Sequence, residues 1–135
     1  MLSGVKEVSI DHVQSEAAAI LRDGYRFVTM TCVDLGEAHD ILYHFDKNYV
    51  MCHLRVALKR GEHLPSISGV CFAATIVENE MKDLFGLEID GLAIDYQGRF
   101  MLSEDAPKAP LNKSVGIGVD IRVKQPESPK EGGQA

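Results

Sequence analysis

Three acidic side chains in one predicted helix are the first candidates for chemistry. Glu78, Glu80 and Asp83 occur within ENEMKDLFG, inside an otherwise apolar segment. Two carboxylates that converge on one pocket can act as general acid and general base. A helical projection at about 100° per residue does not bring these three together. We therefore favour a structural or interface role for them over catalysis.

The same projection predicts which acids are buried. Glu80 falls within one continuous apolar stripe, whereas Glu78 lies off it and within reach of Lys82. The members of the stripe are Ala73, Ile76, Val77, Met81 and Leu84. A carboxylate in an apolar face needs a cationic or hydrogen-bonding partner. We expect Arg55, Arg99 or an arginine of a partner protein to bond Glu80, and Glu78 to face water.

Other chemistry-bearing residues give weaker signals. His44 and His53 lie diagonally on one face of a predicted hairpin, but two histidines are too few for a closed metal site, so surface or interface histidines are favoured. Gly116 and Gly118 lack the third glycine and the following helix of a dinucleotide site. The sequence has three cysteines among apolar neighbours, Cys32, Cys52 and Cys71. They are expected to be reduced, buried thiols, as is typical of a cytoplasmic protein.

Composition predicts one globular domain. The chain has 135 residues, of which 45% are hydrophobic and 25% charged, which is enough to bury a core. We expect residues 1–124 to form the domain and 125–135 to form a disordered tail. A net charge of −6 without a basic stripe argues against a nucleic-acid partner. No signal peptide is recognised, and the longest uncharged run, 64–77, is too short to span a membrane.

Two helices are predicted from periodicity and end signals. The first covers residues 11–23, with Asp11 as its cap and Gln14 at the capping-box position. The second covers residues 72–85 and ends at Gly86.

Strands are predicted where β-branched and aromatic residues alternate with polar ones. They cover residues 25–33, a hairpin of 41–46 and 49–58 that turns at Lys47 and Asn48, and 115–123. The hairpin register places Asp46 opposite Tyr49 and collects the apolar side chains on one face. The order of elements predicts an α+β fold, with a two-layer arrangement of helices on one face of a mixed sheet.

Several short motifs in the middle of the chain resemble one known family. YHF, LRVAL, LPSISGV and AATIVENEMKDLFGLEIDG are similar to the signature region of the C subunit of respiratory complex I, the NADH–quinone oxidoreductase. The resemblance covers roughly residues 40 to 113. The matching positions are Arg55, Pro65, Ser66, Ala73, Ala74, Glu78, Glu80, Asp83, Leu84, Phe85 and Gly86.

The chain also departs from this pattern. Asn79 stands where the family has arginine, Leu92 and Ala93 stand where it has histidine and proline, and only Arg99 remains of an arginine pair. These departures and the compact length look closer to the equivalent subunit of membrane-bound, energy-converting nickel–iron hydrogenases. The resemblance implies a peripheral subunit without an active site or cofactor of its own, on the cytoplasmic side of the cell membrane.

Partners are implied by the resemblance as well. Such a subunit braces a large subunit that holds the nickel–iron site and a small subunit that holds iron–sulfur clusters, and it meets the membrane subunits indirectly. The whole assembly is ferredoxin-linked and pumps ions. Two alternatives stay open: the C subunit of a quinone-reducing complex I, and an independent enzyme that uses the helix carboxylates.

Overall fold

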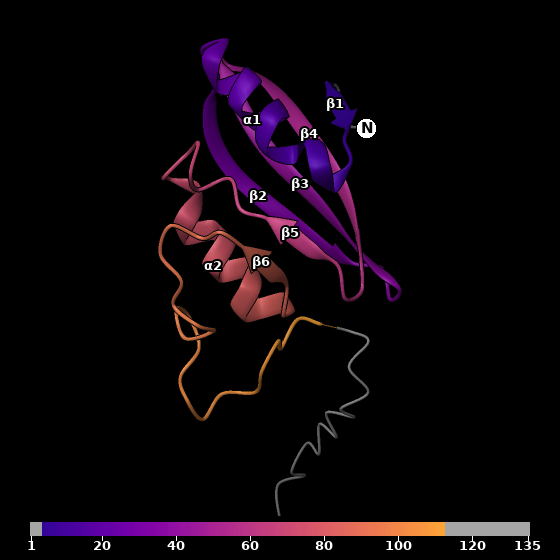
Figure 1. Ribbon diagram of the computed structural model, residues 1–135, viewed down its shortest axis with the longest axis vertical. Helices are drawn as coiled ribbons and strands as arrows, with labels where there is room; N and C mark the ends of the chain where they lie inside the picture. Colours follow the sequence, from indigo (N-terminus) through magenta and orange to yellow (C-terminus); the bar gives the residue numbers. More distant parts are fainter. Residues whose placement is uncertain (1–3, 113–135) are drawn as a thin grey trace, which may run out of the picture.

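A four-stranded mixed sheet forms the centre of the computed structural model, which describes residues 4–112 (Figure 1). The strands are β1 (Val5–Glu7), β2 (Arg26–Asp34), β3 (Ala38–Lys47) and β4 (Val50–Lys59), in the order β1–β4–β3–β2. β1 runs parallel to β4, and the other neighbours are antiparallel. The predicted α+β class with a mixed sheet is confirmed. The predicted strand 115–123 and tail 125–135 lie outside the described residues.

Alternation along β3 and β4 gives the sheet one core face. Ile41, Tyr43 and Phe45 of β3 and Leu54 and Val56 of β4 are completely buried. Successive side chains of a strand point to opposite faces, so these five residues lie on the same side. This is the face that the sequence pattern predicted.

The hairpin turn lies one residue later than predicted. Asn48 and Tyr49 both have positive φ, 51° and 67°, and Lys47 pairs with Val50. The predicted pairing of Asp46 with Tyr49 was therefore wrong by two residues. A two-residue shift leaves every side chain on its original face, so the alternation of apolar residues cannot distinguish these registers.

The first helix begins later than its predicted cap. A 3-10 turn (Ile10–His12) leads into α1 (Val13–Arg22), and no side-chain hydrogen bond caps either element. The cap predicted at Asp11 was wrong. Gln14 does not close a capping box, because its side-chain amide donates to the Ser66 carbonyl at 2.8 Å. Gly24 follows the helix with φ 93°, as its stop position requires.

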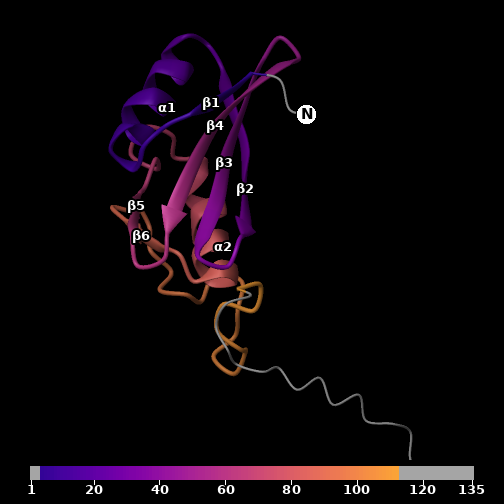
Figure 2. The ribbon, with the colours of Figure 1, turned by 90° about the vertical axis from the view of Figure 1, so that its right-hand side faces the viewer.

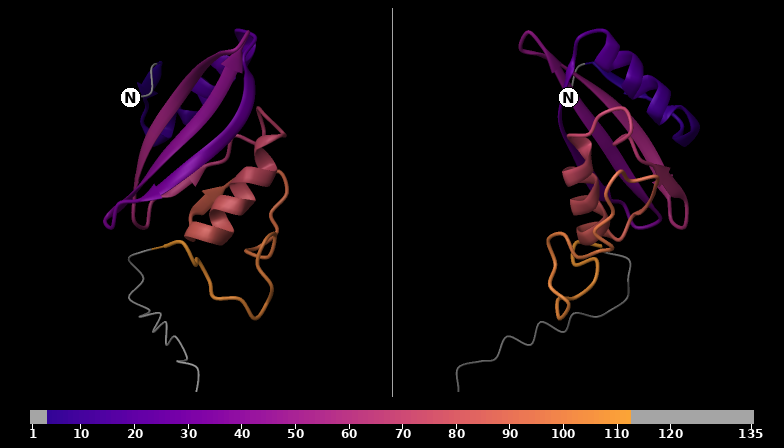
Figure 3. Two further views of the ribbon diagram at one scale, coloured as in Figure 1. Left: turned by 180° about the vertical axis from the view of Figure 1, so that it is seen from behind. Right: turned by 60° about the vertical axis from the view of Figure 1, so that its left-hand side comes forward.

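Both helices cover the core face of the sheet. Val13 and Ala17 of α1 and Ala74 and Met81 of α2 (Ala74–Phe85) belong to the same buried cluster as the inner residues of β3 and β4. Seen from behind, the sheet lies in front of α1, and its outer face carries no helix among the described residues (Figures 2 and 3). None of the described helices is long and apolar enough to cross a membrane.

A second, two-stranded parallel sheet flanks α2. β5 (His63–Pro65) pairs with β6 (Glu88–Asp90). Its register brings Leu64 beside Ile89, and both are buried. Leu64 is extended, as a residue that precedes proline usually is. This small sheet fixes the segment before α2 to the segment after it, so α2 is held at both ends.

Candidate functional site

α2 turns a different face toward the core than the apolar stripe predicted. Ile76 is 58% exposed, whereas Glu78 is completely buried. The buried residues of the helix are Ala74, Thr75, Glu78, Asn79, Met81 and Asp83. The prediction that Glu78 faces water was wrong, and so was the burial predicted for Ile76. Glu78, Asn79 and Asp83 are buried where backbone groups of distant segments bond to them, which a projection of the helix alone does not reveal.

Glu78 connects α2 to the segment before it. Its Oε1 accepts a hydrogen bond from the backbone N–H of Ile67 at 2.8 Å. Burial raises the pKa of this carboxyl, and the Ser66 hydroxyl and the Ile67 N–H oppose that shift in part. Its Oε2 is buried without a hydrogen-bond partner among the described residues, as is the hydroxyl of Tyr43. No ion pair with Lys82 forms, because Lys82 bonds Asp95 instead.

The Pro65–Ser68 segment is tied down by hydrogen bonds at both serines. The Ser66 and Ser68 hydroxyl oxygens lie 2.6 Å apart, and both residues are buried. The Ser68 hydroxyl also accepts from the backbone N–H of Ala93 at 2.8 Å. Ser66 was a sequence candidate, whereas Ser68 was missed. Ser68 could have been found from the sequence, because it follows Ser66 by two residues and a serine hydroxyl at that spacing can bond local backbone.

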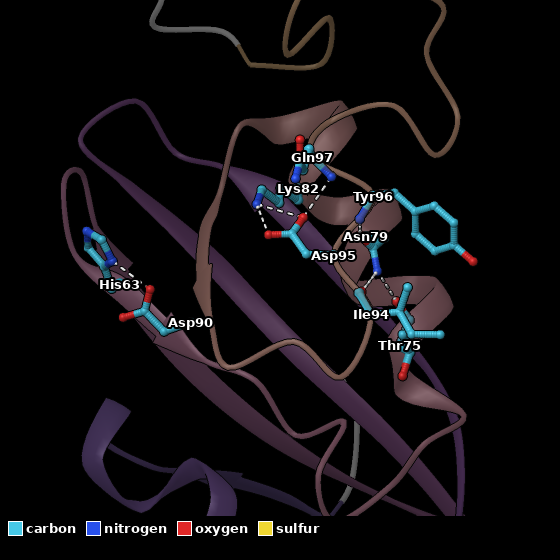
Figure 4. Close-up of polar contacts among 9 residues, drawn as sticks. All are labelled: His63, Thr75, Asn79, Lys82, Asp90, Ile94, Asp95, Tyr96 and Gln97. Carbon is cyan, nitrogen blue, oxygen red and sulfur yellow. Dashed lines mark hydrogen bonds and ion pairs between the residues drawn. The ribbon is translucent and has the colours of Figure 1, made fainter.

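Asn79 fastens the following loop to the helix (Figure 4). Its amide nitrogen donates to the carbonyls of Thr75 and Ile94, both at 2.8 Å. Its carbonyl oxygen accepts from the backbone N–H of Tyr96 at 3.0 Å. The sequence marked Asn79 only as a departure from the family pattern, with no predicted role. An uncharged amide can satisfy donors and acceptors together, and burial of such a group requires both to be bonded.

Asp83 and Lys82 hold the same loop further along. Asp83 Oδ2 accepts from the backbone N–H of Met101 at 2.6 Å, and Asp83 is buried. Lys82 Nζ lies 2.9 Å from Asp95 Oδ2, and the Asp95 carboxylate also accepts from the Gln97 N–H (Figure 4). The hydrogen bond from Lys82 lowers the pKa of Asp95.

The end of α2 is set by Gly86. This residue has φ 67° and caps the helix in the left-handed conformation. A Cβ there would also lie 3.1 Å from the Cβ of Ala109. Phe85 is the residue before Gly86, and its ring packs edge-on against the His39 ring with the two centroids 6.2 Å apart.

The expected partners of Glu80 are engaged elsewhere. Arg55 makes two 2.8 Å hydrogen bonds to Asp40, and Arg99 pairs with Glu104. Glu80 is only partly buried, and no hydrogen bond or ion pair to it occurs among the described residues. The prediction that Arg55 or Arg99 bonds Glu80 was therefore wrong, and a partner protein remains as the third expected source.

The two histidines of the hairpin are direct cross-strand partners. His44 and His53 face each other in the register, with 2.6 Å between their Nδ1 atoms. Both are buried, so the prediction of surface histidines is corrected for this chain. Burial and the neighbouring His53 lower the pKa of His44. The Thr31 hydroxyl oxygen lies within hydrogen-bond distance, 3.1 Å, of Nε2, the other ring nitrogen of His44.

Metal and nucleophile chemistry has little support in residues 4–112. This range contains no group of three or more metal-ligating side chains. All three cysteines are free, as predicted, and partly buried. Burial and two nearby carboxylates raise the pKa of the Cys32 thiol to about 12, which disfavours the reactive thiolate.

An open cavity of about 520 Å³ lies between the end of α2 and the loop that follows. Lys82, Arg99 and Lys108 contribute positive charge to its lining, and Asp83, Glu88 and Glu104 contribute negative charge. The three cations and three carboxylates balance, and Lys82 and Arg99 are already ion-paired, so the lining offers no concentrated charge to a ligand. The site is therefore best described as a helix whose polar side chains bind the chain's own backbone.

Comparisons with known proteins show the family and a relative of similar fold. A sequence profile of the family described as the 30 Kd subunit of respiratory-chain NADH dehydrogenase matches residues 7–119. Comparison with curated proteins gives no significant match.

A solved structure of similar fold belongs to the membrane-bound sulfane sulfur reductase, an archaeal respiratory membrane complex. One of its chains matches with a TM-score of 0.61 and 18% sequence identity. The match covers 78% of this chain and 65% of that chain, so this chain spans about two thirds of the length of that relative. At this identity the likeness shows the fold alone.

Proposed function

We propose a function from one premise: this chain belongs to the family of the 30 kDa subunit of respiratory-chain NADH dehydrogenase. The proposal is that it is a non-catalytic peripheral subunit of a membrane-bound, energy-converting nickel–iron hydrogenase. In this role it braces a large catalytic subunit and an iron–sulfur small subunit on the cytoplasmic side of the membrane. The nickel–iron site and the clusters belong to those partners, and this chain holds no cofactor.

The family match over residues 7–119 is the observation that carries the subunit role. The choice of a hydrogenase rests on the departures from the family pattern at Asn79, Leu92 and Ala93. Two further observations support the subunit role. A chain of a respiratory membrane complex has the same fold. The buried polar side chains of α2 bond the backbone of residues 67, 94, 96 and 101, which suits a rigid brace better than an acid–base site.

A second candidate is the C subunit of a complex I that reduces quinone. The description of the matched family favours it directly, because it names an NADH dehydrogenase. Both candidates assign the same structural role to this chain and differ in the chemistry of its partners.

Purification of the intact complex from membranes, through a tag on this chain, separates the candidates. The proposal predicts stoichiometric nickel, iron–sulfur clusters and hydrogen production from reduced ferredoxin. Bound quinone with NADH oxidation and no nickel supports the second candidate instead. Reduction of sulfane sulfur without nickel contradicts the hydrogenase assignment and points to the chemistry of the fold relative. Turnover by the purified chain alone contradicts both subunit roles.

A further inference from the structure

Several large apolar side chains on one side of α2 and on the loop that follows it are exposed. Phe72, two residues before the helix begins, is 66% exposed, and Ile76, four residues later, is 58% exposed. The loop tethered by Asn79 and Asp83 adds Tyr96, 43% exposed, and Met101, 55% exposed. We call the surface formed by Phe72, Ile76, Glu80, Tyr96 and Met101 the α2 outer strip.

Its members are neighbours because of the helix geometry and the two tethers. Ile76 and Glu80 are four residues apart, so they lie one above the other on the helix. Tyr96 is bonded through its N–H to Asn79, three residues from Ile76, and Met101 is bonded to Asp83, three residues from Glu80. The ring of Tyr96 extends away from the helix (Figure 4). The strip therefore runs along the helix and its adjoining loop.

Glu80 gives the strip a chemical preference. It is partly buried, lies one turn from Ile76 on the helix, and makes no ion pair within the described part of the chain. Other acids nearby differ, because Asp95 pairs with Lys82 and Glu104 pairs with Arg99. A carboxylate that loses water in an apolar interface requires a cation or strong donors opposite it.

We propose that the α2 outer strip docks a protein partner whose contact surface is apolar and carries an arginine or lysine opposite Glu80. This deepens the proposed function and rests on it, since the partner is taken to be a subunit of the same complex. A small apolar centre with one desolvated charge pair is a common composition for protein interfaces.

Two other occupants fit less well. A second copy of this chain in a two-fold dimer would bring the same surface against itself and place Glu80 near Glu80, which is repulsive. A lipid surface would meet an unpaired carboxylate on a chain of net charge −6, and anionic headgroups repel such a surface.

Photo-crosslinking in the assembled complex tests this. A photoreactive phenylalanine analogue is placed at Phe72 or Ile76 of the full chain, and at Tyr49 as a control. Tyr49 is 98% exposed at the β3–β4 turn and outside the strip. We expect cross-links from Phe72 and Ile76 to one co-purifying protein, close to an arginine or lysine, and none from Tyr49 to that site. Cross-links only to lipid, to a second copy, or to nothing overturn the proposal.

Charge reversal gives the second measurement. Glu80→Arg should weaken assembly by on the order of 30-fold or more, and reversal of the cross-linked basic residue in the partner should restore it. Glu37→Arg, at an exposed position of the β2–β3 turn, is the matched control and should assemble normally. Equal assembly of the Glu80→Arg and Glu37→Arg chains contradicts the docking strip.

These outcomes are distinguishable from failure of the proposed function. Cross-links through the strip in a complex without nickel keep the docking surface and remove the hydrogenase assignment. A nickel-containing complex whose contacts avoid the strip keeps the hydrogenase assignment and removes the docking surface.

Discussion

The inner and outer faces of α2 reverse the usual relation between polarity and burial. Glu78 on the inner face, and Asn79 and Asp83 beneath the loop that follows the helix, are polar yet buried. On the outer face Phe72 and Ile76 are apolar yet mostly exposed. Each of these three buried polar groups has a bond to backbone of its own chain, and no such bond is seen for Glu80 among the described residues.

This difference separates what holds the fold from what is left for a partner. Burial of a polar group is tolerated when its hydrogen bonds are made, and it then specifies one arrangement of loops. Exposure of large apolar side chains together on one surface is typical of interaction sites. Substitutions of the buried polar groups should therefore affect folding, and substitutions of the exposed apolar side chains should affect assembly.

The largest expected effect comes from Glu78→Ala. This change strands the buried N–H of Ile67, so the free energy of unfolding should fall by about 1–3 kcal/mol. Glu80→Ala is the matched control, and its change should stay within about 0.5 kcal/mol, because Glu80 makes no bond in the described chain. Urea denaturation of the purified full chain measures both. A larger loss for Glu80→Ala would reverse the assignment of the two faces.

Gly86→Ala tests how the helix end supports both faces. The left-handed conformation at φ 67° is unfavourable for alanine, and the added Cβ approaches Ala109. We expect a loss of about 1–2 kcal/mol of unfolding free energy. Gly91 also has positive φ but has open space around it, so Gly91→Ala should lower the unfolding free energy by no more than Gly86→Ala does. An unchanged melting temperature for Gly86→Ala would argue against the observed helix end.

A smaller, local effect is expected from Asp83→Ala. The loop held at Met101 should loosen at a cost of about 1 kcal/mol, since its freed N–H becomes accessible to water. Hydrogen exchange should accelerate around residues 99–103 and not in β3 or β4. Uniform acceleration throughout the chain would mean that Asp83 supports the whole fold.

The weakest effect concerns pH. Burial raises the pKa of Glu78 above its ordinary value of 4.5, so the folded chain holds this proton more tightly than the unfolded chain does. The resulting stabilisation is complete below that ordinary value and is lost as pH rises through the folded pKa. The stability of wild type relative to Glu78→Gln should therefore decrease from acid toward neutral pH. A difference that grows with rising pH would indicate a lowered pKa and a hidden cationic partner.

The sheet was predictable because its information is local. Alternation in β3 and β4 identifies the buried face whichever of the two registers forms, so the core was found although the turn was not. The stop at Gly86 was equally readable, since few other residues adopt that conformation easily.

The orientation of α2 was not predictable from the helix alone. Its apolar stripe and its buried face differ because Glu78, Asn79 and Asp83 find donors and acceptors in distant segments. A projection of the helix contains none of those partners. The resemblance to a respiratory-complex family indicated that these positions matter, while the structure distinguishes Glu78, which is held inside, from Glu80, which is not.

The most direct test of the two-face account compares Ile76→Asp with Glu78→Ala in the tagged full chain. For each variant, the melting temperature of the purified chain and the yield of assembled membrane complex are measured. We predict that Ile76→Asp keeps a normal melting temperature but loses complex, whereas Glu78→Ala lowers the melting temperature first. If Ile76→Asp assembles normally, or if it melts as early as Glu78→Ala, the division of α2 into a folding face and a docking face is contradicted.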